Sequence, residues 1–107
     1  MAGSFDDRQK SFESKFAHDA ELQFKVEARR NRLLGEWAGG ILGKSGDALK
    51  DYAREVVKSD FEEAGDEDVF RKVHGDLGDK VSEADLRAKM TALKGDAKRQ
   101  VMEEVEG

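Results

Sequence analysis

The chain has 107 residues with no cysteine and no proline, and 40% of the residues are Asp, Glu, Lys or Arg. This length allows one domain, and the lack of cysteine excludes a disulfide framework, a thiol nucleophile and a cysteine-ligated metal. The net charge of −5 argues against a nucleic-acid partner. No segment approaches the roughly 20 apolar residues of a membrane span and no signal peptide is visible, so we expect a cytoplasmic protein without direct membrane insertion.

Composition also bounds the hydrophobic core. Leu, Ile, Val and Phe make up 23 residues of the chain, about 21%. This share lies just above the roughly 20% below which a highly charged chain is expected to be disordered. The charge is uneven as well, because residues 1–46 carry net +1 and residues 47–107 carry net −6. We therefore expect a small bundle with at least one weakly packed segment.

The first 18 residues carry three phenylalanines in a polar background. Phe5, Phe12 and Phe16 are separated by seven and then four residues, which places the three rings on one face if a helix forms. The apolar stripe is narrow, so this segment would be a marginal helix by itself in water. By themselves the residues favour a first part of the bundle in which Phe12 and Phe16 are permanently packed. The alternative is a segment that folds on binding a partner.

A long helix is predicted from about residue 19 to residue 42. Its apolar residues recur at helical spacing: Leu22, Val26, Leu33 and Trp37. No helix breaker separates this pattern from the phenylalanine segment, so the two could form one continuous helix. Gly43 or Gly46 is the expected stop.

Three further helices follow in the pattern. The first begins near Ser45 or Asp47 and ends before an acidic stretch at residues 60–65, and the second begins near Asp66 and ends at Gly78. The third begins at Ser82 with a variant of the capping box. No segment alternates apolar and polar residues over the length of a strand. The sequence therefore predicts an all-α fold: a four-helix bundle over residues 19–107, preceded by a mobile or weakly packed N-terminal segment, residues 1–18.

Residues 38–45, with the sequence AGGILGKS, fit a relaxed phosphate-loop pattern in which Ala replaces the first Gly. A true phosphate loop follows a strand, whereas a helix is predicted before this segment. A helix end, a turn and the start of the next helix are therefore the favoured interpretation. Lys44, beside the start of that helix, could still meet a nucleotide phosphate without catalysing a reaction.

The densest basic patch is residues 28–32, which hold three arginines. Arginine suits a carboxylate or a phosphate, and we single out Arg29 because it lies on the side of the apolar stripe. The somewhat favoured alternative is a solvated helix face whose arginines pair with acids of the last helix. His18 and His74 cannot form a metal site by local spacing, and no catalytic arrangement can be assembled.

Five segments carry a resemblance to a known family: FDDR at 5–8, KFAHDAEL at 15–22, ARRNRLLGEWA at 28–38, GKSG at 43–46 and DEDVFRK at 66–72. They resemble the zeta-subunit family, which are small inhibitor proteins of the bacterial F-type ATP synthase. The resemblance covers nearly the whole chain and is specific in the first 46 residues. It implies a four-helix bundle with a mobile N-terminal segment that enters the catalytic interface of the synthase head and stops rotation in the hydrolysis direction.

The resemblance also implies that the bundle binds ADP or ATP without turnover, as a regulatory ligand and not as a required cofactor. The protein would then be an inhibitor and not an enzyme, peripheral on the membrane-bound synthase, with the catalytic head as its partner. For the inhibitory segment we expect apolar anchors and cations that meet acidic rim residues: Phe5, Phe12 and Phe16, with Arg8, Lys10 and Lys15. For the nucleotide we infer four candidates from charge: Arg29, Arg32, Lys44 and Ser45.

Two other functions stay open at this point. One is a small nucleotide-binding or nucleotide-hydrolysing protein that uses the phosphate-loop-like segment at residues 38–45. The other is a generic helical adaptor.

Overall fold

The structure is a computed structural model that describes residues 3–60 and 66–106. Within these ranges the chain forms five α-helices, one short 3₁₀ helix and no strand: α1 (Gly3–His18), α2 (Ala20–Ile41), α3 (Gly46–Ser59), α4 (Glu67–Leu77), η1 (Gly78–Lys80) and α5 (Glu83–Glu106). The predicted all-α class is confirmed. The four helices expected after residue 18 are present, but residues 3–18 form a helix as well, so a count of four was too low.

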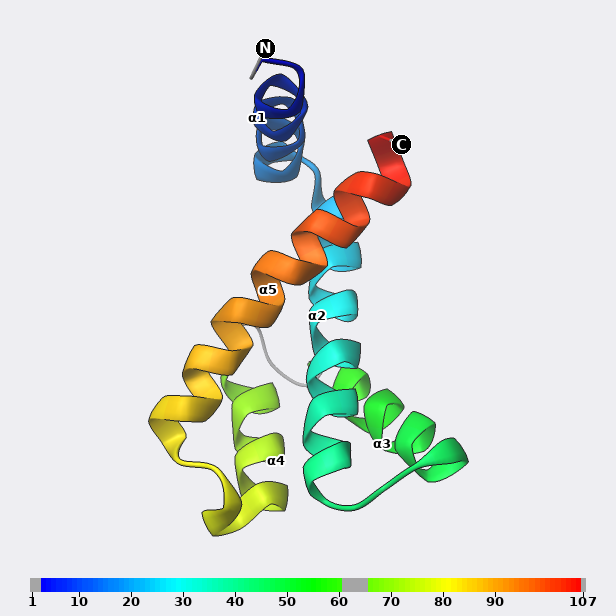
Figure 1. The fold of residues 1–107 in the computed structure, drawn as a ribbon, viewed down its shortest axis with the longest axis vertical. Coiled ribbons are helices and arrows are strands. Elements are labelled where there is room, and N and C mark those ends of the chain that lie inside the picture. The colour runs from blue at the N-terminus through cyan, green and yellow to red at the C-terminus, as the bar shows by residue number, and fades with distance from the viewer. Residues whose placement is uncertain (1–2, 61–65, 107) are drawn as a thin grey trace.

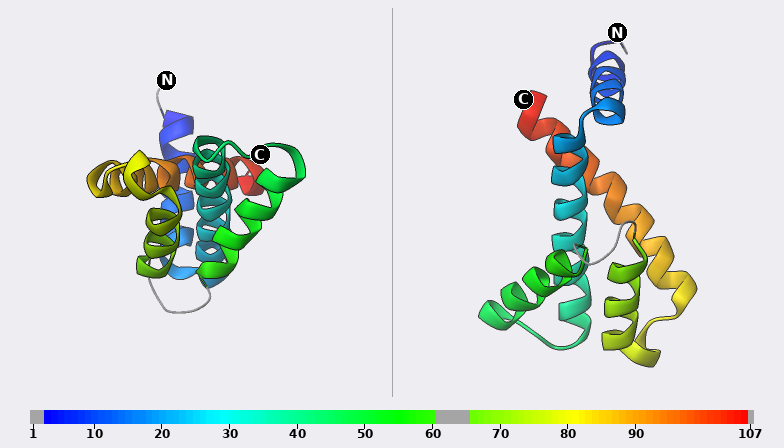
Figure 2. Two further views of the ribbon diagram at one scale, coloured as in Figure 1. Left: turned by 90° about the horizontal axis from the view of Figure 1, so that it is seen from below. Right: turned by 180° about the vertical axis from the view of Figure 1, so that it is seen from behind.

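α2 is the central helix of the molecule (Figure 1). α3 packs against its C-terminal half, α5 crosses it at an angle, and α4 contacts α2, α3 and α5 (Figure 1). α1 and the C-terminal end of α5 lie at one end of the long axis, whereas α3 and α4 lie at the other (Figure 2). The molecule is accordingly elongated, with extents of 46 × 29 × 28 Å.

The junction between α1 and α2 differs from the continuous helix that the residues allowed. Asp19 has an extended backbone, and its carboxylate accepts hydrogen bonds from the backbone N–H groups of Glu21 (2.9 Å) and Leu22 (3.3 Å). These bonds satisfy two of the N–H groups that a helix start leaves without partners. Asp19 therefore ends one helix and begins another, although it is no helix breaker in the usual sense.

Two hydrophobic clusters follow one another along α2. The large cluster joins α2, α3, α4 and α5, and its buried members are Leu34, Ala38, Tyr52, Val56, Val69, Phe70, Val73, Leu77, Leu86, Met90 and Leu93. The terminal cluster joins α1, α2 and α5, and its buried members are Phe12, Leu22, Val26, Ala97, Val101 and Met102. α2 and α5 are the two helices that contribute to both clusters.

The buried face of α2 is rotated from the predicted one. Every fourth residue is buried along one line, which comprises Leu22, Val26, Arg30, Leu34 and Ala38. Leu33 and Trp37, which were expected in the stripe, are only half-buried. Close contact with α3 explains the rotation, because a Cβ on Gly35 would lie 2.6 Å from the Cα of Ala53. The helix turns its smallest side chains to the neighbour that approaches most closely.

Candidate functional site

The phenylalanine face of α1 rests against α2 and α5. Phe12 is 1% exposed and packs into the terminal cluster, with its ring stacked on that of Phe16 at 6.2 Å between centroids. Phe16 is half-buried at the edge of the same cluster. Of the two interpretations drawn from the sequence, the structure thus displays the packed arrangement of these two rings.

Polar contacts also connect α1 to the rest of the bundle. The Gln23 side-chain amide donates a hydrogen bond to the backbone carbonyl of Phe16 at 2.8 Å. Lys98 of α5 reaches α1 from the other side, with Nζ 3.5 Å from a carboxylate oxygen of Glu13 and 4.5 Å from the centroid of the Phe16 ring. Because both ends of this ion pair are solvent-accessible, it contributes at most about 1 kcal/mol.

The remaining predicted residues of the inhibitory segment lie on the same helix. Lys10 and Lys15 are exposed, so their charges face solvent. The backbone of Phe5 and Arg8 is part of α1, whereas their side chains are not among those that the structure describes. α1 therefore presents one face to the bundle and a surface of mixed charge to solvent, because Asp7 and Glu13 are exposed as well.

Arg29 contacts α5, as the alternative interpretation of the basic patch expected. Its guanidinium donates to the Gln100 side chain at 2.9 Å and to a carboxylate oxygen of Glu104 at 2.8 Å. The same residue lines a hollow of about 490 Å³ between α2 and α5, together with Arg32 and the exposed ring of Phe24. The charge of Arg29 is thus partly neutralised by Glu104.

Arg32 is exposed and carries no ion pair within the described residues. It also lines a second hollow of about 480 Å³ between α2 and α3, which it shares with three further cations: Lys50, Arg54 and Lys58. The only acid lining this hollow within the described chain is Glu36. The α2–α3 groove is therefore strongly positive in a protein whose net charge is −5.

Lys44 and Ser45 lie beyond the C-terminal end of α2, whereas Arg29 lies near the middle of the helix. Since a helix rises about 1.5 Å per residue, the turns between Arg32 and Ile41 separate the two groups by roughly 14 Å. Ser45 precedes α3 without a capping hydrogen bond from its side chain. The four candidates for nucleotide binding therefore do not converge: Arg29 and Arg32 share a hollow, and Lys44 and Ser45 lie elsewhere.

Lys44 instead belongs to a polar surface around Tyr52. Its Nζ lies 5.6 Å from the ring centroid, and Lys72 lies 5.3 Å from the same ring. The Tyr52 hydroxyl donates to Asp76 at 2.8 Å, and burial together with that carboxylate raises the pKa of Tyr52 well above its usual value. Tyr52 is a hydrogen-bonded residue of the large cluster.

The phosphate-loop-like segment has the favoured structure. α2 continues through Ile41, the chain turns at Gly43 with φ of +82°, and α3 begins at Gly46. A positive φ is a conformation that glycine adopts without steric cost, which is why the helix ends there. Helix, and not strand, precedes the glycines.

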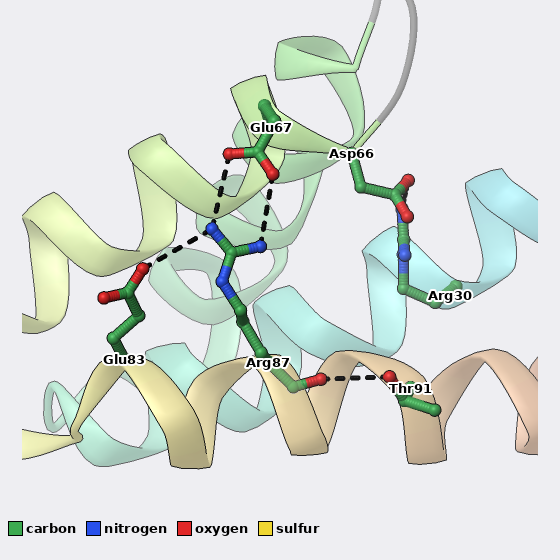
Figure 3. A network of polar contacts seen from close by, with 6 residues as sticks. All are labelled: Arg30, Asp66, Glu67, Glu83, Arg87 and Thr91. Carbon is green, nitrogen blue, oxygen red and sulfur yellow. Dashed lines mark hydrogen bonds and ion pairs between the residues drawn. The ribbon is translucent and has the colours of Figure 1, made fainter.

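A buried charged group on α2 was missed from the sequence. Arg30 is 1% exposed, and its guanidinium donates to the side-chain oxygen of Asn31 at 2.6 Å. It also donates to Asp66 at 2.9 Å, and Figure 3 shows these two side chains facing each other. The hydrogen bond from Arg30 lowers the pKa of Asp66 against the opposing effect of burial. Burial has the larger effect at the nearby Asp60 and raises its pKa. Arg30 thus fixes the start of α4 against the middle of α2.

A second arginine connects α4 to α5. Arg87 lies 3.2 Å from a carboxylate oxygen of Glu67 and 3.5 Å from one of Glu83 (Figure 3). Its guanidinium also stacks 3.8 Å from the centroid of the Phe70 ring. The pair with Glu67 is exposed, unlike the one at Arg30. Both arginines are structural in their contacts, and neither faces a hollow described above.

Comparison with known proteins adds to this geometry. A family model described as ATPase inhibitor subunit zeta matches residues 1–100. A structure solved by NMR in solution is 60% identical over 78% of this chain and 98% of its own, with a TM-score of 0.72. No curated protein matches the chain. Among the described residues, no helix is both long enough and apolar enough to cross a membrane.

Proposed function

The chain belongs to the family of ATPase inhibitor zeta subunits, and from this premise we propose that it inhibits ATP hydrolysis by the F-type ATP synthase through its N-terminal helix. Residues 1–18 would be the inhibitory segment and residues 19–107 the bundle that carries it. α1 would enter the catalytic interface of the synthase head as a helix and block rotation, while the protein stays peripheral on the membrane-bound enzyme.

The separate start of α2 at Asp19 is the observation that carries this proposal. Because Asp19 starts α2 by its own hydrogen bonds, α1 is a distinct helix joined to the bundle through one residue. α1 also combines a ring-bearing face with exposed cations at Lys10 and Lys15. An amphipathic helix of this kind fits an apolar groove with an acidic rim.

Deletion tests the proposal directly. We expect the chain without residues 1–18 to keep helices α2–α5 and to lose inhibition of ATP hydrolysis by the purified synthase head. A subtler variant, Lys10→Glu, should weaken inhibition without altering the fold because Lys10 is exposed. Lys80→Glu makes the same charge change on the exposed η1 and serves as the control. Undiminished inhibition by the truncated chain would refute the proposal.

We also propose that the bundle binds ADP or ATP as a regulatory ligand, without turnover. The hollows on either side of Arg32 support this placement, because the one between α2 and α3 brings three further cations near its exposed guanidinium. We expect ADP to shift the NMR signals of residues around Arg32, and Arg32→Gln to reduce those shifts. Lys44→Gln is the comparison variant, since Lys44 lies apart. Shifts that cluster at Lys44 would move the site, and shifts confined to α5 would refute the placement.

A further inference from the structure

The face of α1 that the proposed function requires is occupied in this structure. Phe12 is assigned to an apolar groove of the partner, yet it is 1% exposed against α2 and α5 of its own chain. Phe16 is half-buried beside it. One ring cannot fill two apolar sites at the same time. Docking of α1 on its own bundle and its insertion into the partner are therefore mutually exclusive.

We propose that the cleft between α2 and α5 is an internal docking site for α1, which stores the inhibitory face, so that α1 must leave this cleft before the protein can inhibit. This inference rests on the proposed function of α1. The docked form then competes with the partner, and the apparent affinity of the protein for the synthase is reduced by the fraction of molecules in which α1 is docked.

The contacts in the cleft suit a reversible association. The contacts that the structure describes at α1 include the fully buried Phe12 ring, the hydrogen bond from Gln23 and the ion pair from Lys98, whereas the other helices share the large cluster. A hollow of about 310 Å³ lies beside Phe12, lined in part by Gly95 and Met102. The packing around the anchor is incomplete there, so the docked state is weaker than a filled core would make it.

Lys98 offers a way to weaken docking without touching α1. It lies on α5, pairs with Glu13 and covers the Phe16 ring. Lys98→Glu places two carboxylates together and removes the cation from the ring, so a larger fraction of α1 is undocked. We expect the concentration for half-maximal inhibition to fall about twofold to fivefold, which is the range for one exposed ion pair.

Lys89→Glu is the matched control. Lys89 also lies on α5 with its Nζ over an aromatic ring, 5.5 Å from the Trp37 centroid, but it is far along the helix from α1. We expect this variant to inhibit like the unmodified chain. A gain of inhibition in Lys98→Glu alone supports internal docking. Unchanged or weaker inhibition in Lys98→Glu overturns it.

A reversible crosslink provides the opposite perturbation. The chain has no cysteine, so the double variant Glu13→Cys with Lys98→Cys can be bridged by a short bismaleimide whose spacer contains a cleavable disulfide. We expect the concentration for half-maximal inhibition to be at least tenfold higher for the bridged protein than for the unbridged one. Cleavage of the spacer should restore inhibition. The bridged pair Glu67→Cys with Arg87→Cys joins α4 to α5, leaves α1 untouched and should inhibit before and after cleavage.

The outcomes separate this inference from the function on which it rests. Glu13→Cys capped with N-ethylmaleimide shows whether a modified α1 still inhibits. If the capped and cleaved forms inhibit and the bridged form inhibits equally well, internal docking is wrong and the proposed function stands. If removal of residues 1–18 leaves inhibition intact, the proposed function itself is wrong.

Discussion

Phe12→Ala tests how α1 is held on the bundle. Phe12 is 1% exposed and is the one buried residue that α1 contributes to the terminal cluster within the described part of the chain. Its replacement removes a fully buried aromatic ring and leaves a cavity, which in protein cores costs about 3–5 kcal/mol. We take the lower end, about 3 kcal/mol, because a hollow already adjoins the ring and α1 can shift into it.

The effect should be local, because α2, α3, α4 and α5 share the large cluster, which Phe12 does not enter. A loss of about 3 kcal/mol corresponds to a roughly 150-fold increase in the undocked population. We therefore expect amide hydrogen exchange to speed up by about two orders of magnitude at the protected amides of α1. The amides around Val56 and Val73, in the large cluster, should exchange at unchanged rates.

Phe24→Ala is the control for this experiment. This substitution deletes the same ring atoms as Phe12→Ala, but the Phe24 side chain is 54% exposed. The exchange rates of the α1 amides should therefore stay within a few-fold of those in the unmodified chain. Equal protection of α1 in the Phe12→Ala and unmodified chains would refute the argument that this ring holds α1. Uniform loss of protection across all helices would refute the division into two clusters.

Four further predictions concern stability, each measured by denaturant unfolding. Asp60→Asn should raise the free energy of unfolding at pH 7, because burial raises the pKa of Asp60, and the gain should vanish below about pH 4, where the carboxyl is protonated in both states. Asp66→Asn should lower stability at pH 7 and flatten the loss of stability on acidification, because a lowered pKa stabilises the fold only above the unfolded value; an unchanged acid profile would contradict this. Gly35→Ala should lower the free energy of unfolding by about 1–3 kcal/mol, because its Cβ forces α2 away from α3. At Gly40 a Cβ meets nothing within 4 Å, so Gly40→Ala should leave the free energy of unfolding unchanged or raise it by up to about 1 kcal/mol. Equal effects of the two substitutions would refute the close approach of α2 and α3. Glu67→Gln should cost less than about 1 kcal/mol, since its pair is exposed, and a larger loss would show that the pair is worth more than its exposure allows.

Periodicity was sufficient to predict the helices but not the face that α2 buries. The ends at Gly43, Gly78 and Ser82 could be read locally, because a capping residue acts on its own neighbours. The buried line through Arg30 could not be predicted locally, since Asp66, which pairs with Arg30, is 36 residues away in the sequence. The step of four from Val26 to Arg30 to Leu34 was the available signal, and the charge of Arg30 obscured it.

The candidate site shows the same division. The resemblance correctly indicated the family, and the exposure of Lys10 and Lys15 agrees with a surface role. Grouping Arg29 with Lys44 by charge ignored the length of α2 between them. The sequence could not show whether the Phe12 ring is buried or exposed. The answer depends on α5, which contributes Ala97 and Met102 to the terminal cluster about 85 residues or more after Phe12.

The cap at Asp19 has a mechanical consequence. In a continuous helix, a pull on the N-terminal turns would be carried along the backbone hydrogen-bond ladder into the helix that follows. Here the ladder is interrupted, and the first N–H groups of α2 are held by a side chain of the bundle itself. A force on α1 is therefore not transmitted to α2 through backbone hydrogen bonds at Asp19. α1 can swing or unwind while α2 keeps its first turn and Arg30 keeps its place.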